Sequence, residues 1–228
     1  MSLLKWSVIS LFSVTLLLVI LFFYASFNSS SDLFGDVISQ VDVNNEKIVF
    51  LSFDDGPSYN TPMILKALNE SNVSATFFLV GKNIKGNEEK VRDIYNQGHD
   101  IGTHSMTHPY LLANPYDEIY KSKKVIEDTI NDTIIFFRPP FGFRTSQVIK
   151  TAEKLELKTI MWSSFPRDYL ANNNKTSEKI IKDLKPGLII VLHDHDKESY
   201  NTIRELPNII LEIKKNGYEI GKLSDYVN

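Results

Sequence analysis

The stretch IVFLSFDDGP, residues 48–57, decides how this sequence folds. Its first six residues are apolar except for Ser52, a composition typical of a strand that is buried on both faces of a sheet. Asp54 and Asp55 follow this strand directly, and the next two residues, Gly56-Pro57, are turn formers. The stretch predicts a buried strand that ends in a loop with two adjacent carboxylates.

Strands and helices alternate along the chain from Lys47 onward. Short apolar runs predict strands over residues 48–53, 73–80, 99–103, 134–137, 157–162, 188–192 and 218–220. Amphipathic stretches predict helices over residues 61–70, 88–97, 114–130, 146–155, 177–184 and 202–216. Thr61 is expected as the first helix N-cap, because Pro62 suits the first helical turn. This order indicates a mostly parallel sheet, either closed as a barrel or open and doubly wound.

Polar side chains gather where the predicted strands end. Each of the following comes directly after a strand: Asp54-Asp55, His104, Arg138, the stretch 163–169, and His193-Asp194. In a parallel α/β protein the carboxyl ends of the strands share one face, and active sites form there. We therefore expect residues from distant parts of the chain to meet in one pocket.

His104 and His108 form an HxxxH pair about fifty residues after the double aspartate. Such a pair arises often by chance, and two adjacent carboxylates can form a simple turn. Imidazole and carboxylate together, however, are ligands that zinc prefers, and three protein ligands with an open position are typical of a catalytic site. Asp55 is expected as the third ligand. Asp54 could then take a proton from the attacking water, held ionised by Arg138.

His193 follows the apolar run 189–192 and therefore emerges from a buried strand. A histidine in this position is ordinarily a hydrogen-bonded core residue. Beside the other polar clusters it becomes a candidate general acid, and Asp168 could hold its ring and raise its pKa. His99 is interpreted as structural and His195 as a solvated loop residue.

The first 27 residues predict a transmembrane anchor. No charge lies between Lys5 and Asp32, and roughly 20 apolar residues span a bilayer as a helix. A cleaved signal peptide is the alternative, but its apolar region is shorter and residues 24–26 are a poor cleavage site. Lys5 before the helix places the N-terminus in the cytoplasm and the rest outside. Residues 28–46 are expected to be a linker, and residues 47–228 the catalytic domain.

Composition excludes several classes of function. The 228 residues contain no cysteine, so cysteine nucleophiles and thiolate metal sites are excluded. The net charge is −3 and there is no basic stripe, so we expect no nucleic-acid partner. Hydrophobic residues make up 43% of the chain, enough for the domain to be held together by its core. We expect a monomer.

Three stretches resemble the NodB-type polysaccharide deacetylases, carbohydrate esterase family 4. They are SFDDGP at residues 52–57, GHDIGTHSMTH at 98–108 and RPPFG at 138–142. The resemblance covers residues 47–227 and implies a distorted (β/α) barrel with one divalent metal, usually zinc, with cobalt, nickel, manganese or iron as alternatives. It also implies hydrolysis of N- or O-acetyl groups on polysaccharide.

The resemblance implies a role for each matching residue. Asp54 is similar to the general base, and Asp55, His104 and His108 to the metal ligands. Arg138 matches the partner that orients Asp54, the amide of Phe141 an oxyanion donor, His193 the general acid, and Asp168 its orienting carboxylate. The substrate is expected to contact Pro140, Phe141, Tyr169 and Val191.

Three of the five motifs depart from the family pattern. Tyr169 follows Asp168 where tryptophan is usual, with Phe165 at an earlier acidic position; Val191 replaces leucine, and Phe141 replaces tyrosine. These changes bear on the acyl pocket. The leading hypothesis is an extracytoplasmic deacetylase of N-acetylated amino sugars, peptidoglycan by default. An O-acetyl esterase and a membrane-anchored glycan-binding pseudoenzyme are the alternatives; the latter would have lost Asp54, a metal ligand or His193, and none is lost.

Overall fold

The strand that begins the motif stretch lies at the centre of the sheet. In the computed structural model, which describes residues 2–170, 176–195 and 200–227, β1 (Ile48–Asp54) pairs with three neighbours. These are β2 (Thr76–Leu79), β6 (Leu188–His193) and β7 (Glu219–Ile220), all parallel to it. The sheet continues through β3 (Asp100–Thr103), β4 (Phe136–Phe137) and β5 (Lys158–Thr159), in the order β5-β4-β3-β2-β1-β6.

The two ends of this sheet meet beyond β5. The chain after β5 runs on to Ser164, which bridges Ile190 in β6 in parallel. The amides of Ser163 and Ser164 each donate to the Ile189 carbonyl at 3.0 Å, and the Val191 amide donates to the Ser164 carbonyl at 3.1 Å. The sheet is therefore curled, with an irregular join, and the expected distorted barrel is confirmed.

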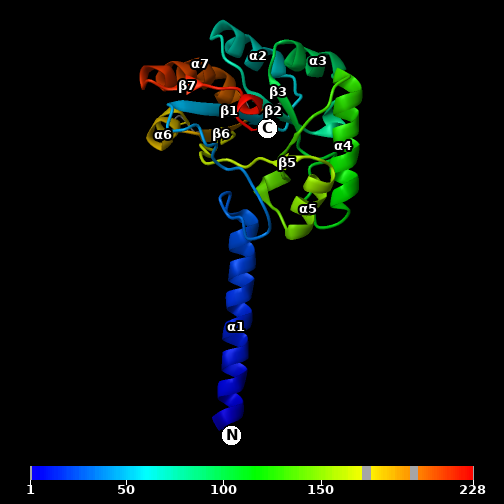
Figure 1. Cartoon of the computed structure of the whole chain (residues 1–228), viewed down its shortest axis with the longest axis vertical. Coiled ribbons are helices and arrows are strands. Elements are labelled where there is room, and N and C mark those ends of the chain that lie inside the picture. Colours follow the sequence, from blue (N-terminus) through cyan, green and yellow to red (C-terminus); the bar gives the residue numbers. More distant parts are fainter. Residues whose placement is uncertain (1, 171–175, 196–199, 228) are drawn as a thin grey trace.

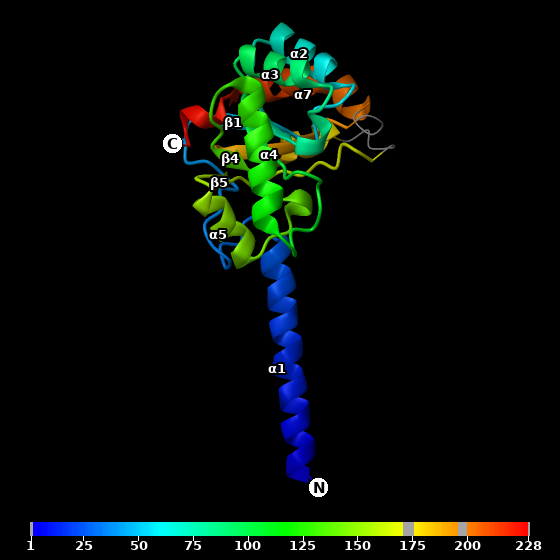
Figure 2. The same cartoon turned by 90° about the vertical axis from the view of Figure 1, so that its right-hand side faces the viewer.

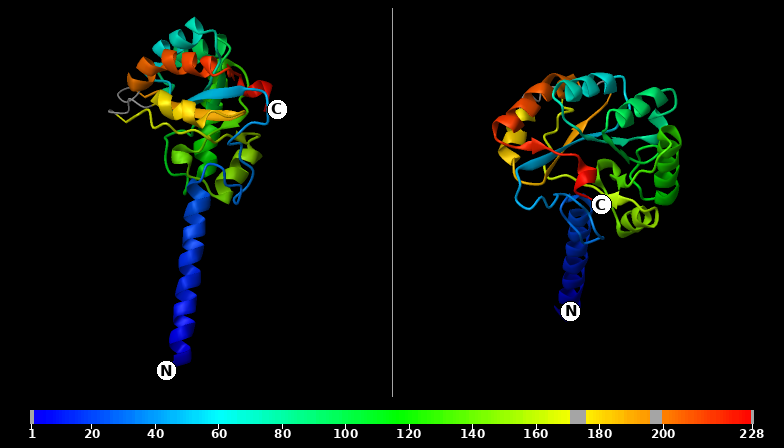
Figure 3. Two further views of the ribbon diagram at one scale, coloured as in Figure 1. Left: turned by 90° about the vertical axis from the view of Figure 1, so that its left-hand side faces the viewer. Right: turned by 45° about the horizontal axis from the view of Figure 1, so that its top comes forward.

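In the described part of the chain, helices surround the strands (Figures 1 and 3). They are α2 (Thr61–Glu70), α3 (Glu88–Asn96), α4 (Pro115–Ile130), α5 (Ser146–Lys154), α6 (Thr176–Asp183) and α7 (Tyr200–Lys215). Each predicted helix is found within two residues of its predicted bounds. β1 and β6 each extend one residue beyond the predicted strand, whereas β2, β3, β4, β5 and β7 are shorter than predicted, because residues at their ends leave the ladder. Three 3-10 turns were not predicted: η1 (Gly81–Asn83), η2 (Pro140–Gly142) and η3 (Leu223–Asp225).

Every residue of β1 is buried, and its two faces serve different purposes. Val49, Leu51 and Phe53 pack into the core between the sheet and the helices. Phe50 belongs to a second core inside the curl. Since side chains alternate along a strand, Ser52 and Asp54 share the inner face with Phe50. The strand thus carries a carboxylate into the interior of the barrel.

Helix α1 (Ser2–Phe27) projects away from the domain (Figures 1 and 2). Its segment Ile9–Phe27 has a mean hydropathy of 2.3 and is 11% buried, so it is long and apolar enough to cross a membrane. Its last turn is part of the domain, because Ala25 and Ser26 are buried. The guanidinium of Arg144 donates to the carbonyl of Ser31 at 2.8 Å and also to that of Asn28.

The expected linker, residues 28–46, differs from a free tether. Ile38 bridges Ile160, and Val41 and Val43 are buried in the inner core. The Val41 amide donates to the carbonyl of Gly187 at 2.9 Å. A Cβ on Gly187 would lie 1.8 Å from the Val41 carbonyl oxygen, so glycine is required there. At least residues 38–43 therefore complete the folded domain.

Candidate active site

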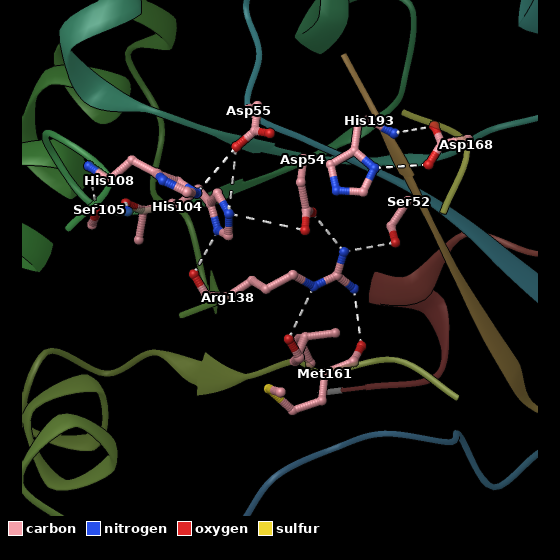
Figure 4. Close-up of polar contacts among 12 residues, drawn as sticks. Ser52, Asp54, Asp55, His104, Ser105, His108, Arg138, Met161, Asp168 and His193 are labelled. Carbon is pink, nitrogen blue, oxygen red and sulfur yellow. Dashed lines mark hydrogen bonds and ion pairs between the residues drawn. The ribbon is translucent and has the colours of Figure 1, made fainter. Parts of the chain in front are cut away.

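Three side chains that can bind a metal converge where β1 and β3 end (Figure 4). The Nε2 atom of His108 lies 3.2 Å from Asp55 Oδ1, and Nε2 of His104 lies 3.7 Å from the same oxygen. One donor atom from each of the three residues lies within 4.8 Å of the other two. Asp55, His104 and His108 thus have the composition and spacing of a three-ligand site for a divalent metal.

One hydrogen bond orients the His104 imidazole toward this point, and another fixes the backbone of His108. His104 Nδ1 lies 2.8 Å from the carbonyl of Arg138, which can only accept, so Nδ1 carries the proton and Nε2 offers its lone pair. The His108 amide donates to Ser105 Oγ at 3.0 Å. Burial, and then the neighbouring His104, lowers the pKa of His108 to about 4. The ring is therefore neutral at neutral pH, as a metal ligand must be.

The backbone of the site adopts sparsely populated conformations. Asp55, Ser105, His108 and Phe141 all have positive φ, at 76°, 68°, 62° and 59°. Such conformations cost of order 1–3 kcal/mol each for non-glycine residues and cluster at functional sites. The surrounding fold holds these loops in positions that local preference alone would not select.

Asp54 lies beside the three donors but binds Arg138. Its Oδ1 accepts from Arg138 Nη1 at 2.7 Å, and its Oδ2 is 4.0 Å from His104 Nε2. Burial opposes ionisation, but Arg138, with His104 and His193, holds the pKa of Asp54 below its usual range. Asp54 is therefore a buried carboxylate that remains ionised.

Arg138 is fully buried and its donors are occupied by fixed partners. It donates to Ser52 Oγ at 2.8 Å and to the carbonyls of Ile160 at 3.1 Å and Met161 at 2.9 Å. Its guanidinium lies 4.0 Å from the ring centre of Phe78. Arg138 thus ties β1, β4 and the chain after β5 together inside the barrel and fixes the orientation of Asp54.

His193 lies directly across from Asp54, since the two residues are register partners in β6 and β1. Its Nδ1 is 2.8 Å from Asp168 Oδ1, and its backbone amide donates to Asp168 Oδ2 at 2.8 Å. Asp168 is fully buried and also accepts from Thr202. Burial alone would lower the pKa of His193, but the hydrogen bond and charge of Asp168, with Asp54 and Asp55, raise it to about 9. His193 is therefore protonated at neutral pH.

A family model for polysaccharide deacetylases matches residues 42–160. The chain belongs to this family. A peptidoglycan-N-acetylglucosamine deacetylase of Bacillus cereus is 36% identical over 192 residues, which cover 80% of this chain and 89% of that protein.

Solved structures of the family have the same fold. The Bc1960 peptidoglycan N-acetylglucosamine deacetylase superposes with a TM-score of 0.79 at 27% identity, over 83% of this chain and 92% of that one. A mutant of BA3943, a Bacillus anthracis protein described as a pseudoenzyme, superposes with a TM-score of 0.78 at 28% identity, over 85% and 71%. Both active and inactive proteins thus share this architecture.

A cavity of about 340 Å³ in this deacetylase joins the donor cluster to His193. Of the expected substrate contacts, Phe141, Tyr169 and Val191 line it. Pro140 does not line it; it is buried in η2, one residue before the exposed ring of Phe141. The ring of Tyr169 meets His193 edge-on with centroids 5.0 Å apart.

Four lining residues of the deacetylase pocket were not predicted as site residues: Gly142, Trp162, Phe165 and His195. Trp162 ends the predicted strand 157–162, and Phe165 falls in the polar stretch that follows it and replaces an acidic position of the family pattern. Their position at a strand end could have signalled both. His195 is exposed, as expected of a loop residue, yet it lines the pocket. No local pattern indicates this.

Asp194 is a further residue that sequence reasoning left without a role. It is fully buried and accepts from Ser58 Oγ at 2.5 Å and Thr61 Oγ1 at 2.6 Å. Thr61 was expected as the N-cap of α2, but Asn60 occupies that position, and the Thr61 hydroxyl binds Asp194 instead. A Cβ on Gly56 would lie 2.6 Å from Asp194 Oδ2. Asp194 thus holds the loop that follows Asp55.

Proposed function

We propose that this protein is a metal-dependent hydrolase that removes acetyl groups from N-acetylated amino sugars of an extracytoplasmic polysaccharide, with peptidoglycan as the polymer. One observation carries the proposal. An ionised carboxylate, Asp54, and a protonated imidazole, His193, lie side by side on adjacent strands and line one cavity, beside three metal donors. Amide hydrolysis needs a base for water and an acid for the amine, and this pair supplies both.

The donor set fits a divalent metal, and zinc suits two imidazoles and a carboxylate best. Asp55, His104 and His108 would hold it through Oδ1, Nε2 and Nε2. When bound, such an ion acts as a Lewis acid toward the acetyl carbonyl and lowers the pKa of water. The neutral state of His108 and the lone pair on His104 Nε2 leave both rings ready to bind it.

Asp54 would act as the general base. Its Oδ2 is directed toward the donor cluster, and its Oδ1 is engaged by Arg138. It can take a proton from the water that attacks the acetyl carbon. Arg138 is buried and is held by Ser52 and two carbonyls, so its guanidinium cannot turn away toward solvent. It therefore keeps Asp54 ionised and oriented between turnovers.

His193 would act as the general acid. The departing amine is strongly basic and cannot leave unprotonated. Asp168 occupies Nδ1 of His193, so Nε2 is the nitrogen that can deliver a proton to the amine nitrogen. The buried carboxylate of Asp168 stabilises the protonated ring, and the raised pKa keeps His193 protonated at neutral pH.

The pocket wall would select a small acyl group. Trp162, Phe165, Tyr169 and Val191 line the cavity with aromatic and aliphatic surface. On the opposite side, η2 carries Phe141, whose amide we assign as an oxyanion donor. Phe141 packs on His108 with ring centroids 4.5 Å apart, so the oxyanion loop and the metal side form one unit.

Helix α1 would anchor the protein, with the catalytic domain outside the cytoplasm. Its apolar length supports this. The burial of Ala25 and Ser26 in the domain supports retention of the helix over cleavage, because removal at residues 24–26 would expose a packed surface. Detection of the intact N-terminus by mass spectrometry of membrane-extracted protein would test this assignment.

Two other functions remain as alternatives. An O-acetyl esterase would use the same base and metal site, but it would depend less on a general acid that is protonated at neutral pH. A glycan-binding pseudoenzyme is supported by the similarity to BA3943, which is described as one. This chain, in contrast, retains Asp54, His193 and all three donors in a shared pocket.

Acetate release tests the proposal. The full chain in detergent is incubated with N-acetylated and O-acetylated glycans, before and after chelation and with added zinc, cobalt, nickel, manganese or iron. We expect metal-restored acetate release from N-acetylated glycan, and none from an Asp54→Asn variant. Glycan binding without acetate release from any polymer would favour the pseudoenzyme.

A further inference from the structure

A second cavity opens beside the donor cluster, on the side away from His193. Its volume is about 630 Å³, larger than that of the catalytic pocket at about 340 Å³. The two cavities share Asp55, His108 and His195 in their walls, so they adjoin each other. A polymer whose reacting sugar lies in the catalytic pocket must continue into neighbouring space, and this cavity provides it.

The wall of the second cavity is basic. Lys82, Lys85 and Lys90 line it, from η1 and the start of α3. Within the described part of the chain, none of these three ammonium groups forms an ion pair with a carboxylate. By contrast, Lys121 and Lys124 on nearby α4 pair with Asp117 and Asp128. Glu88 at the start of α3 interacts electrostatically with Lys85, but Asp55 is the one carboxylate that lines the cavity, so positive charge predominates on this wall.

Backbone carbonyls of the catalytic loops hold two of these lysines in place. Lys90 Nζ donates to the carbonyl of Ser58 at 2.8 Å, in the loop after Asp55, and to Asn87 Oδ1 at 2.8 Å. Lys82 Nζ donates to the carbonyl of Thr107 at 3.5 Å, directly before His108. The charges are therefore positioned relative to the metal donors.

Two amides join the same wall to the metal side. Asn83 Nδ2 donates to the carbonyl of Asp55 at 2.9 Å, and Asn87 Nδ2 donates to the carbonyl of Asn83 at 2.8 Å. Through these bonds η1 is fixed against the loop that carries Asp55. Asp55 is the one carboxylate among the lining residues, and a divalent metal bound to it would offset its charge.

We propose that this cavity binds a carboxylate-bearing unit of the glycan, adjacent to the sugar that is deacetylated. The proposal rests on the proposed function and adds a substrate class to it: an anionic glycan rather than a neutral one. Ammonium groups are compact charges that attract a carboxylate without demanding one geometry, which suits a substituent on a flexible lactyl or peptide arm. The polar lining would pair with sugar hydroxyls.

A matched pair of glycans tests the proposal. One is a peptidoglycan strand stripped of its stem peptides, which bears free lactyl carboxylates; the other is the same strand after chemical reduction of these carboxylates to alcohols. Affinity is measured by calorimetry with the full chain in detergent, in an Asp54→Asn background that prevents turnover. Acetate release is measured in parallel with the wild type.

We expect the carboxylated strand to bind three- to tenfold more tightly, a preference that declines as salt is raised, because the charges are solvent-accessible. The double substitution Lys82→Gln with Lys85→Gln should remove most of the preference. Lys66→Gln with Lys121→Gln removes the same net charge from exposed positions on α2 and α4 and should leave the preference unchanged.

Equal affinity of the wild type for both strands would overturn the proposal, and so would an equal loss of preference in the control. The two proposals fail separately. A protein that prefers the carboxylated strand yet releases no acetate retains the anion site and loses the deacetylase assignment. A protein that deacetylates both strands with equal affinity does the reverse.

Discussion

His108 and His193 face the same cavity, yet their surroundings shift their pKa values in opposite directions. Burial, and then the nearby His104, lowers the pKa of His108 to about 4. Burial also acts to lower the pKa of His193, but the hydrogen bond and charge of Asp168 reverse the sign and raise it to about 9. The first ring is suited to bind a metal and the second to donate a proton.

The difference lies in which neighbours dominate each ring. For His108, burial and the adjacent ring of His104 outweigh Asp55, whose Oδ1 lies 3.2 Å from Nε2, and the Nδ1 of His104 itself is bonded to a neutral carbonyl. In the acid side a buried carboxylate bonds Nδ1 of His193 at 2.8 Å. A carbonyl orients an imidazole without charging it, whereas a buried carboxylate orients and charges it.

The largest expected effect comes from breaking the metal side. His104→Ala removes a donor that is 3% exposed, and we expect stoichiometric divalent metal and acetate release both to be lost. Elemental analysis of the purified protein measures the metal. His99→Gln, at a buried histidine outside the site, is the control and should keep its metal. Undiminished metal in His104→Ala would contradict the ligand assignment.

Removing the base separates proton transfer from metal binding. Asp54→Asn retains the shape of the side chain but cannot accept a proton, so kcat should fall by a factor on the order of 10² or more. Because Arg138, not a donor residue, is the direct partner of Asp54, the metal should remain bound. If the variant loses its metal, then Asp54 and Asp55 have exchanged roles.

Removing the acid should affect amide and ester substrates unequally. In His193→Ala, N-deacetylation should fall on the order of 10²-fold, since an amine must be protonated to leave. Hydrolysis of an activated aryl acetate, whose leaving group is weakly basic, should fall by much less. The ratio of the two rates is the readout. Equal losses would show that His193 does not act as the acid, and would remove its contrast with His108.

The sequence alone was sufficient to predict the elements that are marked by short-range patterns. The buried strand at residues 48–53, the turn after it and the amphipathic helices each carry a pattern of apolar residues or turn formers. The convergence of Asp54, His104 and His193 followed from topology alone, because the carboxyl ends of parallel strands meet at one face. The irregular elements were missed.

Residues 38–43 were expected in a linker because the segment around them is rich in serine and asparagine. The place of this segment in the domain, with Val41 and Val43 buried, depends on pairing with Ile160 and Gly187, which lie far away in the sequence and give no local signal. The basic cavity lined by Lys82, Lys85 and Lys90 likewise has no local signal in the sequence. Its lysines look like an ordinary solvated surface until η1 is bonded to the loop that carries Asp55. Such features depend on tertiary contacts, which no short-range pattern encodes.

The smallest expected effect is on the stability of the fold. It distinguishes His193 from His99 and His108 by the pH range in which each residue contributes to stability. The folded pKa of His193, about 9, exceeds the unfolded value of about 6.5, so its contribution is fully present below pH 6.5 and is lost as pH rises through 9. His99 and His108 have folded pKa values of about 4, so their contribution is present above pH 6.5 and is lost as pH falls toward 4. We therefore expect the melting temperature Tm of the metal-free protein to be highest near pH 6.5.

The alkaline decline belongs to His193 alone among these residues. In the metal-free protein the raised pKa of His193 should contribute about 1–3 kcal/mol between pH 6.5 and 9, or a few degrees to about 10 °C in Tm. Thermal unfolding of the full chain in detergent measures this. His193→Gln should abolish the alkaline decline and leave the acidic one, whereas His99→Gln should reduce the acidic decline only. A decline above pH 6.5 that persists in His193→Gln would show that Asp168 does not hold His193 protonated in the folded protein, and the opposition between the two sides of the pocket would fail.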